Sequence, residues 1–342
     1  MQLRTAYTQR ASRSKHYATI NASERFTVEA AQAAISQLSV MFILILVGFF
    51  LRKLNYVTHE ASLPFNSLLI HVALPCLIIA SVSKVHLEDV ASQLVPTFVL
   101  AFAEFLLLFI VAILINAVLK TPLTQRNLYV FMSLCTNTGF VVLPVLQAVY
   151  GDQTVMLSSI FVLMCNLFMG SLGIAALESA QKGQHKLTGF RITWKTLWNA
   201  PLVACVFAIV WLFSGLTMPD VAQSTLSLMG GICTPVAMVI VGIVLADSDL
   251  KAIFTDWRMY AYVVIRQLAI PALLAVVLAP FVADKLILAT TIIMFAAPAG
   301  AMVQAFAQRY DQDINLAASG TVITTLACIP IFPALIALLS VL

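Results

Sequence analysis

The sequence predicts an all-helical, polytopic membrane protein with ten transmembrane helices, arranged as two inverted repeats of five. Three observations favour this fold class. Of the 342 residues, 61% are hydrophobic and only 10% are charged, at a mean hydropathy of +0.98. The apolar residues fall into ten stretches of spanning length. An offset of 160 residues then places the first five stretches on the last five.

The composition excludes a soluble enzyme, because soluble domains carry about 25% charged residues. A membrane span takes roughly 20 residues, so about 209 apolar residues suffice for about ten spans. We predict the spans, in order, over residues 35–51, 63–83, 94–118, 128–149, 155–177, 198–216, 223–246, 260–281, 286–307 and 315–341.

The loops between the predicted spans differ in their lysine and arginine content. Cationic loops stay in the cytoplasm, so this difference orients the bundle. The loops after the odd-numbered spans hold eleven basic residues: Arg52, Lys53, Lys120, Arg126, Lys182, Lys186, Arg191, Lys195, Lys251, Arg258 and Arg309. The loops after the even-numbered spans hold two, Lys84 and Lys285. We therefore expect both ends of the helical bundle outside the cytoplasm, with the bundle in a plasma membrane.

Residues 1–34 oppose this orientation, because they carry five bases against two acids. Three explanations stay open: a disordered extension, a targeting peptide rich in arginine and serine, or a mis-called start. No apolar stretch precedes residue 35, so a cleaved secretory signal is not expected. We favour the disordered or mis-called extension. The predicted repeats cover 35–177 and 198–342, and a cytoplasmic linker covers 178–197.

Charge and cysteine content exclude several further classes. The net charge is +4, and without the N-terminal extension the chain is close to neutral, so nucleic acid is not an expected partner. The six cysteines lie in apolar stretches without C-x-x-C spacing, which indicates neither disulfides nor a zinc site. No cofactor or metal is expected. No GxxxxGK[ST] motif occurs, so an ion gradient or the membrane potential must supply energy.

The two sets of five spans correspond in several details. At the 160-residue offset three features coincide: Pro75 with Pro235, Tyr150 with Tyr310, and 137–139 with 297–299. Five is an odd number, so the second set enters the membrane from the opposite side. Inverted repeats are typical of alternating-access transporters, with the site at the repeat interface. Chance coincidence of similar spans is the alternative.

Spans four and nine are interrupted at corresponding positions. Span four contains the run 135–139 followed by Pro144, and span nine contains 296–300 with Pro298. Lipid cannot satisfy the backbone groups that glycine and proline free, so such breaks persist only inside protein or along a cavity. Half-helix N-termini there attract an anion, and freed carbonyls attract a cation. Simple packing kinks are the alternative.

Six motifs in order along residues 35–342 resemble the auxin efflux carrier family, whose members include bacterial dicarboxylate carriers and plant PIN proteins. The motifs are FNSLLIHVALPCL from Phe65, TNTGFVVLPVLQAVYG from Thr136, TPVAMVIVGIVLA from Thr234, IRQLAIPALL from Ile265, AAPAGAMVQAFAQRY from Ala296 and AASGTVITTL from Ala317.

The resemblance implies a scaffold part (spans 1, 2, 6 and 7) and a transport part (spans 3–5 and 8–10). It also implies that the broken fourth and ninth helices cross at the substrate site. The linker of about 20 residues favours the short bacterial type, similar to malate or malonate carriers, because PIN proteins carry a long loop there. Alanines flank Pro298, so ligand contact from that side would rely on backbone groups.

The expected substrate-binding residues lie at the two breaks and beside them. They are Asn66, Thr136, Asn137, Thr138, Gly139, Arg266, Ala297, Pro298 and Gln304. Asn66 belongs to the family motif on the scaffold side. We also expect interhelical hydrogen bonds from Gln147, Asn166, Gln304, Gln308, Ser319 and Thr325.

Two formal charges lie deep inside predicted spans, Glu104 in the third and Arg266 in the eighth. Intramembrane charges are costly and indicate function. Arg266 would bind a carboxylate through its fork of donors, and Glu104 would carry a coupling proton. A structural ion pair, or an arginine that snorkels to the surface, is the alternative. His71 is a second ion-coupling candidate, because imidazole titrates near neutral pH, although a lone histidine often serves packing.

The expected function is secondary transport of a small organic anion, a mono- or dicarboxylate such as malate or malonate. Expected partners are this substrate, a coupling proton or sodium ion, and the lipid bilayer; a homodimer stays open. A cation/proton antiporter is the first alternative, but no Asp lies inside a predicted span. An intramembrane enzyme is the second, yet the spans supply neither paired carboxylates nor a nucleophile beside His71.

Overall fold

The computed structural model describes residues 39–58, 62–82, 87–151, 153–181, 200–247, 255–300 and 302–342, together with residue 36. The predicted extension 1–34 and most of the predicted linker 178–197 lie outside the described residues. Within the described ranges, every regular element is a helix, and strand-like pairing is limited to one isolated antiparallel bridge.

Among the described residues, each predicted apolar stretch is mainly helical, and the stretches 128–149 and 286–307 are interrupted by non-helical segments. The first five correspond to a helix over 39–53 and to α2 (Ser62–Leu68), η2 (Leu69–Ala73), α3 (Leu74–Val82), α4 (Leu87–Val118), α5 (Leu123–Leu134), η3 (Thr138–Val142), α6 (Leu143–Tyr150), α7 (Gln153–Phe168), η4 (Met169–Gly173) and α8 (Ile174–Gln181). The η segments are π-helical turns within longer helices.

The remaining stretches correspond to the second set of helices. These are α10 (Ala200–Ser214), α11 (Asp220–Gly231), α12 (Cys233–Asp247), α14 (Trp257–Val263), η5 (Val264–Ala269), α15 (Ile270–Leu278), α16 (Lys285–Phe295), α17 (Met302–Arg309) and α18 (Ile314–Val341). Five described helical stretches are long and apolar enough to cross a membrane, and three shorter helices are also apolar. The protein is therefore a nearly all-helical, multi-pass membrane protein.

Prolines explain three of the π-helical turns. The turns η2, η3 and η5 each end two residues before a proline, namely Pro75, Pro144 and Pro271. A proline removes one helical hydrogen bond and its ring crowds the carbonyl four residues earlier, which in each case lies inside the widened turn. These prolines therefore account for the π-helical turns that directly precede them.

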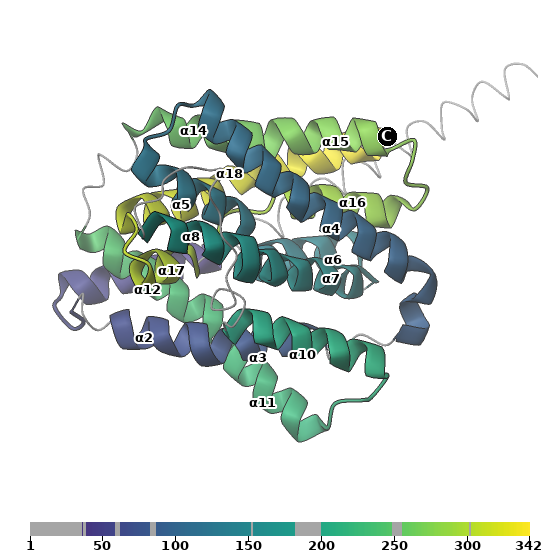
Figure 1. Ribbon diagram of the computed structural model, residues 1–342, viewed down its shortest axis with the longest axis horizontal. Coiled ribbons are helices and arrows are strands. Elements are labelled where there is room, and N and C mark those ends of the chain that lie inside the picture. The colour runs from purple at the N-terminus through teal and green to yellow at the C-terminus, as the bar shows by residue number, and fades with distance from the viewer. Residues whose placement is uncertain are drawn as a thin grey trace, which may run out of the picture.

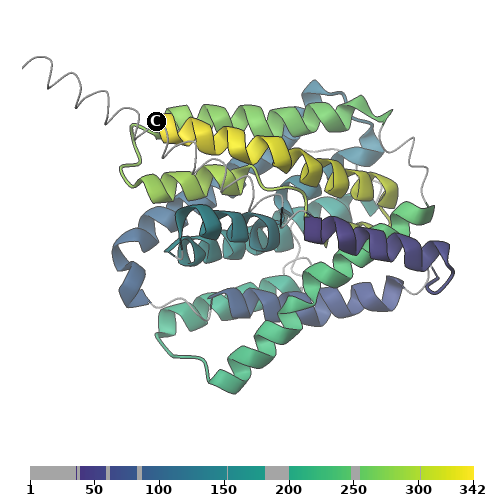
Figure 2. The ribbon, with the colours of Figure 1, turned by 180° about the vertical axis from the view of Figure 1, so that it is seen from behind.

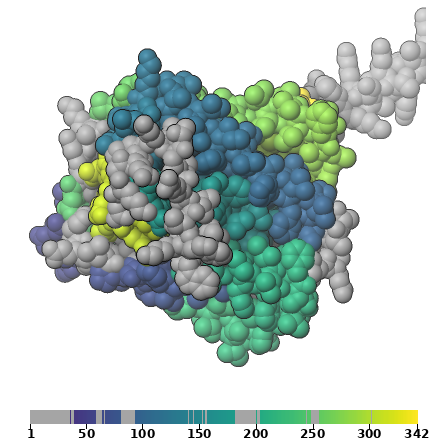
Figure 3. Space-filling view, viewed as in Figure 1, coloured from purple at the N-terminus to yellow at the C-terminus, as the bar shows by residue number. Residues whose placement is uncertain are grey.

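The helices form two groups (Figure 1). The small layer consists of the helix over 39–53 with α2, α3, α10, α11 and α12, and α3 packs against both α10 and α11. The large layer consists of α4–α8 and α14–α18, in which α4 contacts α5, α7 and α16. Figure 2 shows the same separation from behind, and in Figure 3 the surface of α10 and α11 projects at the lower edge.

A close helix contact holds the small layer together. The helix over 39–53 crosses α12 at Gly242, where an added Cβ would collide with the backbone of Ile45. Small residues permit such approach, which is a common way for membrane helices to associate. At the end of the same pair, Arg52 Nε donates to Asp247 Oδ2 at 2.8 Å.

The large layer encloses a well-buried core. All residues of α16 from Ile287 to Phe295 are buried. The rings of Tyr129 and Tyr262 stack edge to face at 5.3 Å between centroids, and the Tyr262 hydroxyl lies 2.9 Å from Ser133 Oγ. These contacts fix α14 and η5 against the end of α5, beside the first helix break.

Candidate functional site

The predicted breaks are present, and they pair with each other. The first break separates Leu134 from Thr138, and the second separates Phe295 from Met302. Two hydrogen bonds between backbone atoms join them, from the Asn137 amide to the Pro298 carbonyl (2.8 Å) and from the Gly300 amide to the Cys135 carbonyl (2.7 Å). Together they form an antiparallel bridge between Thr136 and Ala299. The pairing satisfies backbone groups that lipid would leave unbonded.

Arg266 holds one further carbonyl from each break. It is fully buried on η5, and its Nη1 donates to the Ala297 carbonyl while its Nη2 lies 3.4 Å from the Ser133 carbonyl. In a continuous helix, Ser133 would accept from the amide of Asn137, but that amide donates to Pro298 instead. The guanidinium therefore replaces helical hydrogen bonds that the breaks have removed.

Side chains of neighbouring helices satisfy the rest of the second break. Gln267 Nε2 donates to the Ala296 carbonyl at 3.2 Å. The hydroxyl of Thr324 on α18 accepts from the Ala299 amide at 3.0 Å, and Thr321 Oγ1 lies 3.4 Å from the Gly300 carbonyl. As a result, the main-chain polar groups of this break are largely occupied by protein.

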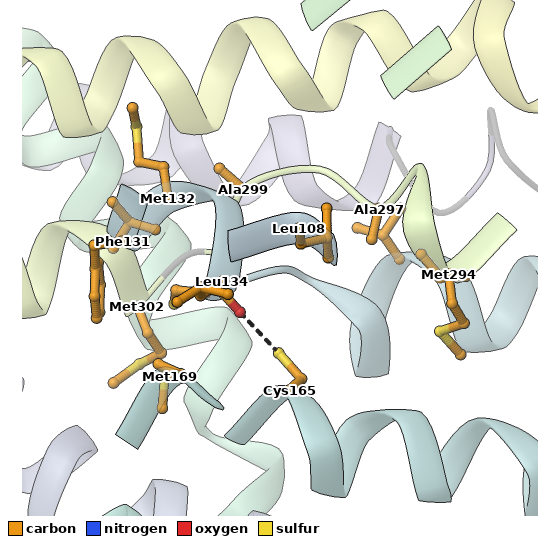
Figure 4. Close-up of a cluster of buried hydrophobic side chains, with 14 of the residues drawn as sticks. Leu108, Phe131, Met132, Leu134, Cys165, Met169, Met294, Ala297, Ala299 and Met302 are labelled. Atoms are coloured by element: carbon orange, nitrogen blue, oxygen red, sulfur yellow. Dashed lines mark hydrogen bonds between the residues drawn. The ribbon is translucent and has the colours of Figure 1, made fainter. Parts of the chain in front are cut away.

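Cys165 on α7 performs a similar role at the first break. Its thiol donates to the Leu134 carbonyl at 3.3 Å, the contact drawn in Figure 4. The same view shows Ala297 and Ala299 on the irregular segment between α16 and α17, next to the end of α5. The thiol also lies 3.3 Å from Thr136 Oγ1.

A cavity of about 350 Å³ opens beside the first break, between the small and the large layer. From the small layer it is lined by residues of α3, α11 and α12, including Leu74, Leu77, Ser227 and Thr234. From the large layer it is lined by the first break and Leu143, by one face of α7, and by Gly300 of the second break with the adjoining Met302. Among the lining residues no side chain carries a formal charge.

The structure brings four of the predicted site residues together in this cavity: Thr136, Asn137, Thr138 and Gly139. Asn137 is 5% exposed, and its Nδ2 has no hydrogen-bond partner among the described residues. The backbone amides of Thr138 and Gly139 begin the helix η3–α6, where main-chain N–H groups lack helical partners. This end of the cavity thus offers neutral donors.

Four other predicted residues do not line the cavity. Ala297, Pro298 and Gln304 are buried behind the first break, and Arg266 uses both terminal nitrogens on carbonyls. Both polar atoms of the Gln304 side chain lack a hydrogen-bond partner in the described structure. In this arrangement Arg266 acts on the backbone instead of presenting its fork to a carboxylate.

Glu104 lies buried on α4 at 4% exposure, and neither carboxylate oxygen has a hydrogen-bond partner in the described part of the chain. It interacts electrostatically with Arg266, but no ion pair within 4.0 Å joins these two described residues. The structural ion pair, which was the alternative to a functional role, is therefore not formed between these residues. The carboxylate lies inside the large layer without a hydrogen-bond partner among the described residues.

His71 lies apart from the cavity and links the two layers. Its Nε2 lies 2.9 Å from Arg309 Nη1, and its Nδ1 lies 2.9 Å from the Ser67 carbonyl. Arginine only donates, so Nε2 accepts and Nδ1 carries the proton. Asn66 sits in α2, and its side chain lies outside the described atoms.

Sequence reasoning missed Ser159, Cys165 and Ser227 as lining residues, and it assigned Asn166 to interhelical bonding. Asn166 instead donates to Val162 within its own helix at 2.7 Å. Thr325, another expected interhelical donor, has no hydrogen-bond partner among the described residues. The helical spacing of 159, 162, 166 and 169, all lining the cavity, is the signal that was available.

Comparison with known proteins gives a consistent result. A family model described as "Membrane transport protein" matches residues 33–336. An uncharacterised transporter of Methanocaldococcus jannaschii is 25% identical over 296 residues, which cover 84% of this chain and 92% of the relative. An uncharacterised transporter of Methanothermobacter thermautotrophicus is 22% identical over 304 residues, covering 86% and 95% respectively.

Proposed function

The chain belongs to the membrane transport protein family, and on that premise we propose that it is a secondary active transporter for a small organic anion. The substrate is a mono- or dicarboxylate such as malate or malonate, bound in the cavity beside the first break. No catalytic role is proposed. The observation that carries the proposal is the unpartnered Asn137 amide at the wall of this cavity.

The donors at the first break suit an anion. Asn137 Nδ2 is buried without a hydrogen-bond partner among the described residues, and the helix η3–α6 begins at the next residue. A helix N-terminus carries partial positive charge, which favours carboxylate oxygens. A ligand carboxylate would supply the acceptor that the Asn137 amide lacks, and a buried polar group gains most from such pairing.

The remaining walls limit the size and character of the ligand. Leu74, Leu77, Leu143, Val162 and Met169 line the cavity opposite and beside the donors. A volume of about 350 Å³ lies at the lower end of the range for small-molecule sites, roughly 300–1,000 Å³. The cavity therefore suits a small metabolite better than a lipid or a peptide.

The position of the cavity supports transport by alternating access. Its walls come from α3, α11 and α12 on one side and from the first break and α7 on the other. Displacement of the large layer against the small layer would open the cavity to one face of the membrane and close it to the other. We propose that the layers move in this way. Each layer then combines helices from both proposed inverted repeats, 35–177 and 198–342, which the linker 178–197 joins.

Coupling to an ion gradient is assigned to Glu104 and His71. Glu104 is a buried carboxylate without a hydrogen-bond partner in the described structure, and a group of this kind inside a membrane protein commonly carries protons. His71 joins the two layers at Arg309, so its protonation would act on the same movement. The protein is proposed to work in a bacterial inner membrane, as a monomer or a homodimer.

The test is flux into proteoliposomes with a panel of labelled carboxylates and indole acids, with and without imposed pH and sodium gradients. We expect gradient-dependent flux of at least one carboxylate, and strong loss of it in Asn137→Ala. Proton-for-sodium exchange without flux of any anion would replace this proposal by a cation/proton antiporter.

A further inference from the structure

Arg266 has a place in the molecule that the proposed transport function does not yet use. It is among the largest fully buried side chains in the described structure, and it lies on η5, away from the cavity lining. Burial of a guanidinium is costly unless its donors are bonded. Its two terminal nitrogens reach the carbonyl of Ser133, in the last turn of α5 beside the first break, and that of Ala297 in the second break. Its Nε has no hydrogen-bond partner among the described residues.

These two carbonyls adjoin the contacts that define the site. Ser133 is the second residue before Cys135, whose carbonyl accepts from the Gly300 amide. Ala297 directly precedes Pro298, whose carbonyl accepts from the Asn137 amide. One planar guanidinium therefore bonds both of the paired segments. Asn137, whose amide takes part in the pairing, also lines the cavity.

We propose that Arg266 is the positioning residue of the binding cavity. By bonding one carbonyl of each break, it holds the two breaks in register and fixes the Asn137 amide in the cavity wall. It contacts no ligand itself. The assignment builds on the proposed function because it concerns the same cavity, but its geometric content does not depend on the identity of the substrate.

The shape of the guanidinium explains why arginine suits this position. Its planar fork presents donors in two directions at once, whereas a lysine ammonium is a single point at the end of a flexible stem. Arg266→Lys keeps the buried charge and loses the simultaneous bonding of both carbonyls. The neighbouring Gln267 bonds only the second break and α18, so it cannot take over the link to Ser133.

The first measurement is hydrogen exchange by mass spectrometry on the full chain in nanodiscs. We expect the amides of Asn137 and Gly300 to exchange at least about tenfold faster in Arg266→Lys, because a charge-assisted hydrogen bond that supports them is lost. Arg258→Lys is the matched control, since Arg258 bonds the Leu119 carbonyl at the partly exposed edge of the protein. Unchanged exchange at both amides in Arg266→Lys would overturn the assignment.

Wild-type protein provides a second test if Arg266→Lys does not fold. The Asn137 and Gly300 amides border a cavity in irregular segments, yet the proposed clamp predicts protection comparable to that of the α5 interior. Exchange as fast as that of exposed loop amides would contradict it.

The second measurement separates positioning from direct contact. Binding of malonate and of its neutral diamide is compared in wild type and Arg266→Lys. If Arg266 is a positioning residue, Arg266→Lys lowers the affinity for both ligands by the same factor. The KM of transport then rises about tenfold. A residue that contacts the carboxylate weakens malonate alone, which would refute the proposal. If the wild type binds neither ligand, the proposed substrate class fails, and the exchange result still decides the role of Arg266.

Discussion

The two helix breaks are alike in backbone and unlike in side chains. The first break carries Thr136, Asn137 and Thr138, all of which line the cavity. The second carries Ala297, Pro298 and Ala299, which are buried and do not line it. Each break contributes one amide and one carbonyl to the backbone pairing. Of the described residues, those of the first break present polar side chains to the cavity, and those of the second do not.

The difference shows how the work is divided between the breaks. The main-chain groups of the second break are bonded by Arg266, Gln267, Thr321 and Thr324. The first break keeps a free donor, Asn137 Nδ2, within the described structure. The second break thus serves mainly as a support and adds only Gly300 to the described cavity wall, whereas the first break supplies the polar side chains that face the ligand. Breaking this comparison requires variants on each side.

Removal of the free donor at the first break should have the largest effect. Asn137→Ala is expected to lower carboxylate flux at low substrate concentration by about tenfold to hundredfold, the range for a lost hydrogen bond to a charged group. Asn166→Ala is the matched control, because that amide already donates to Val162 inside its own helix. Equal losses in the two variants would argue against a special role for Asn137.

A steric clash between the two breaks should have the second-largest effect. A Cβ added at Gly300 would lie 3.0 Å from the Cys135 carbonyl, a backbone atom that cannot easily move. Gly300→Ala should therefore lower the free energy of unfolding by about 1–3 kcal/mol, measured by thermal unfolding in detergent. Gly231→Ala, where an added Cβ meets nothing within 4 Å, should be close to neutral. A stable Gly300→Ala protein would show that the pairing tolerates separation.

Loss of one bond to the supporting break should have a smaller effect. Thr324→Val keeps the shape of the side chain but leaves the buried Ala299 amide without its acceptor, at a cost of about 1 kcal/mol. The adjacent Thr325→Val removes a hydroxyl that has no partner among the described residues, so stability should stay equal or rise. Carboxylate affinity should change little in either variant. The reverse order of stabilities would contradict the supporting role.

The smallest effect is expected outside both breaks, at His71. The pair with Arg309 is exposed, and exposed polar pairs contribute less than about 1 kcal/mol. His71→Leu removes the acceptor for Arg309 Nη1, so the free energy of unfolding should fall by less than about 1 kcal/mol. Thermal unfolding in detergent measures this change. A loss larger than that of Gly300→Ala would contradict the ranking.

Much of the first break could be predicted from the sequence, because glycine, proline and polar residues interrupt an otherwise apolar span there. The second break was predicted from the corresponding Ala296–Gly300 run, and the family resemblance implied that the two broken helices cross, but the hydrogen bonds between their main chains were not predicted. The supports could not be predicted, since Gln267, Thr321 and Thr324 lie on spans whose rotation depends on packing. Arg266 stood out as a buried charge, but its carbonyl partners became visible only in the folded chain.

The partners of Glu104 could not be predicted from the sequence either. The sequence marks it as an intramembrane charge at the repeat position equivalent to that of Arg266, with a coupling proton as the expected role and an ion pair as the alternative. In the fold the guanidinium turns to the breaks, and the carboxylate has no hydrogen-bond partner in the described structure. Whether Arg266 bonds the Glu104 carboxylate or the carbonyls of Ser133 and Ala297 depends on distances in the folded chain. The sequence does not contain these distances.

The bridge between Thr136 and Ala299 also constrains how the chain is made. During synthesis the segment around Thr136 enters the membrane long before Ala299 has left the ribosome. Until then the backbone groups of Thr136 and its neighbours lack their hydrogen-bond partners in the second break. We expect a chaperone or the insertion machinery to bind the first half of the chain during this time. Truncation before the second break should therefore yield a protein that is degraded, whereas two separately expressed fragments that meet in the membrane should restore each other.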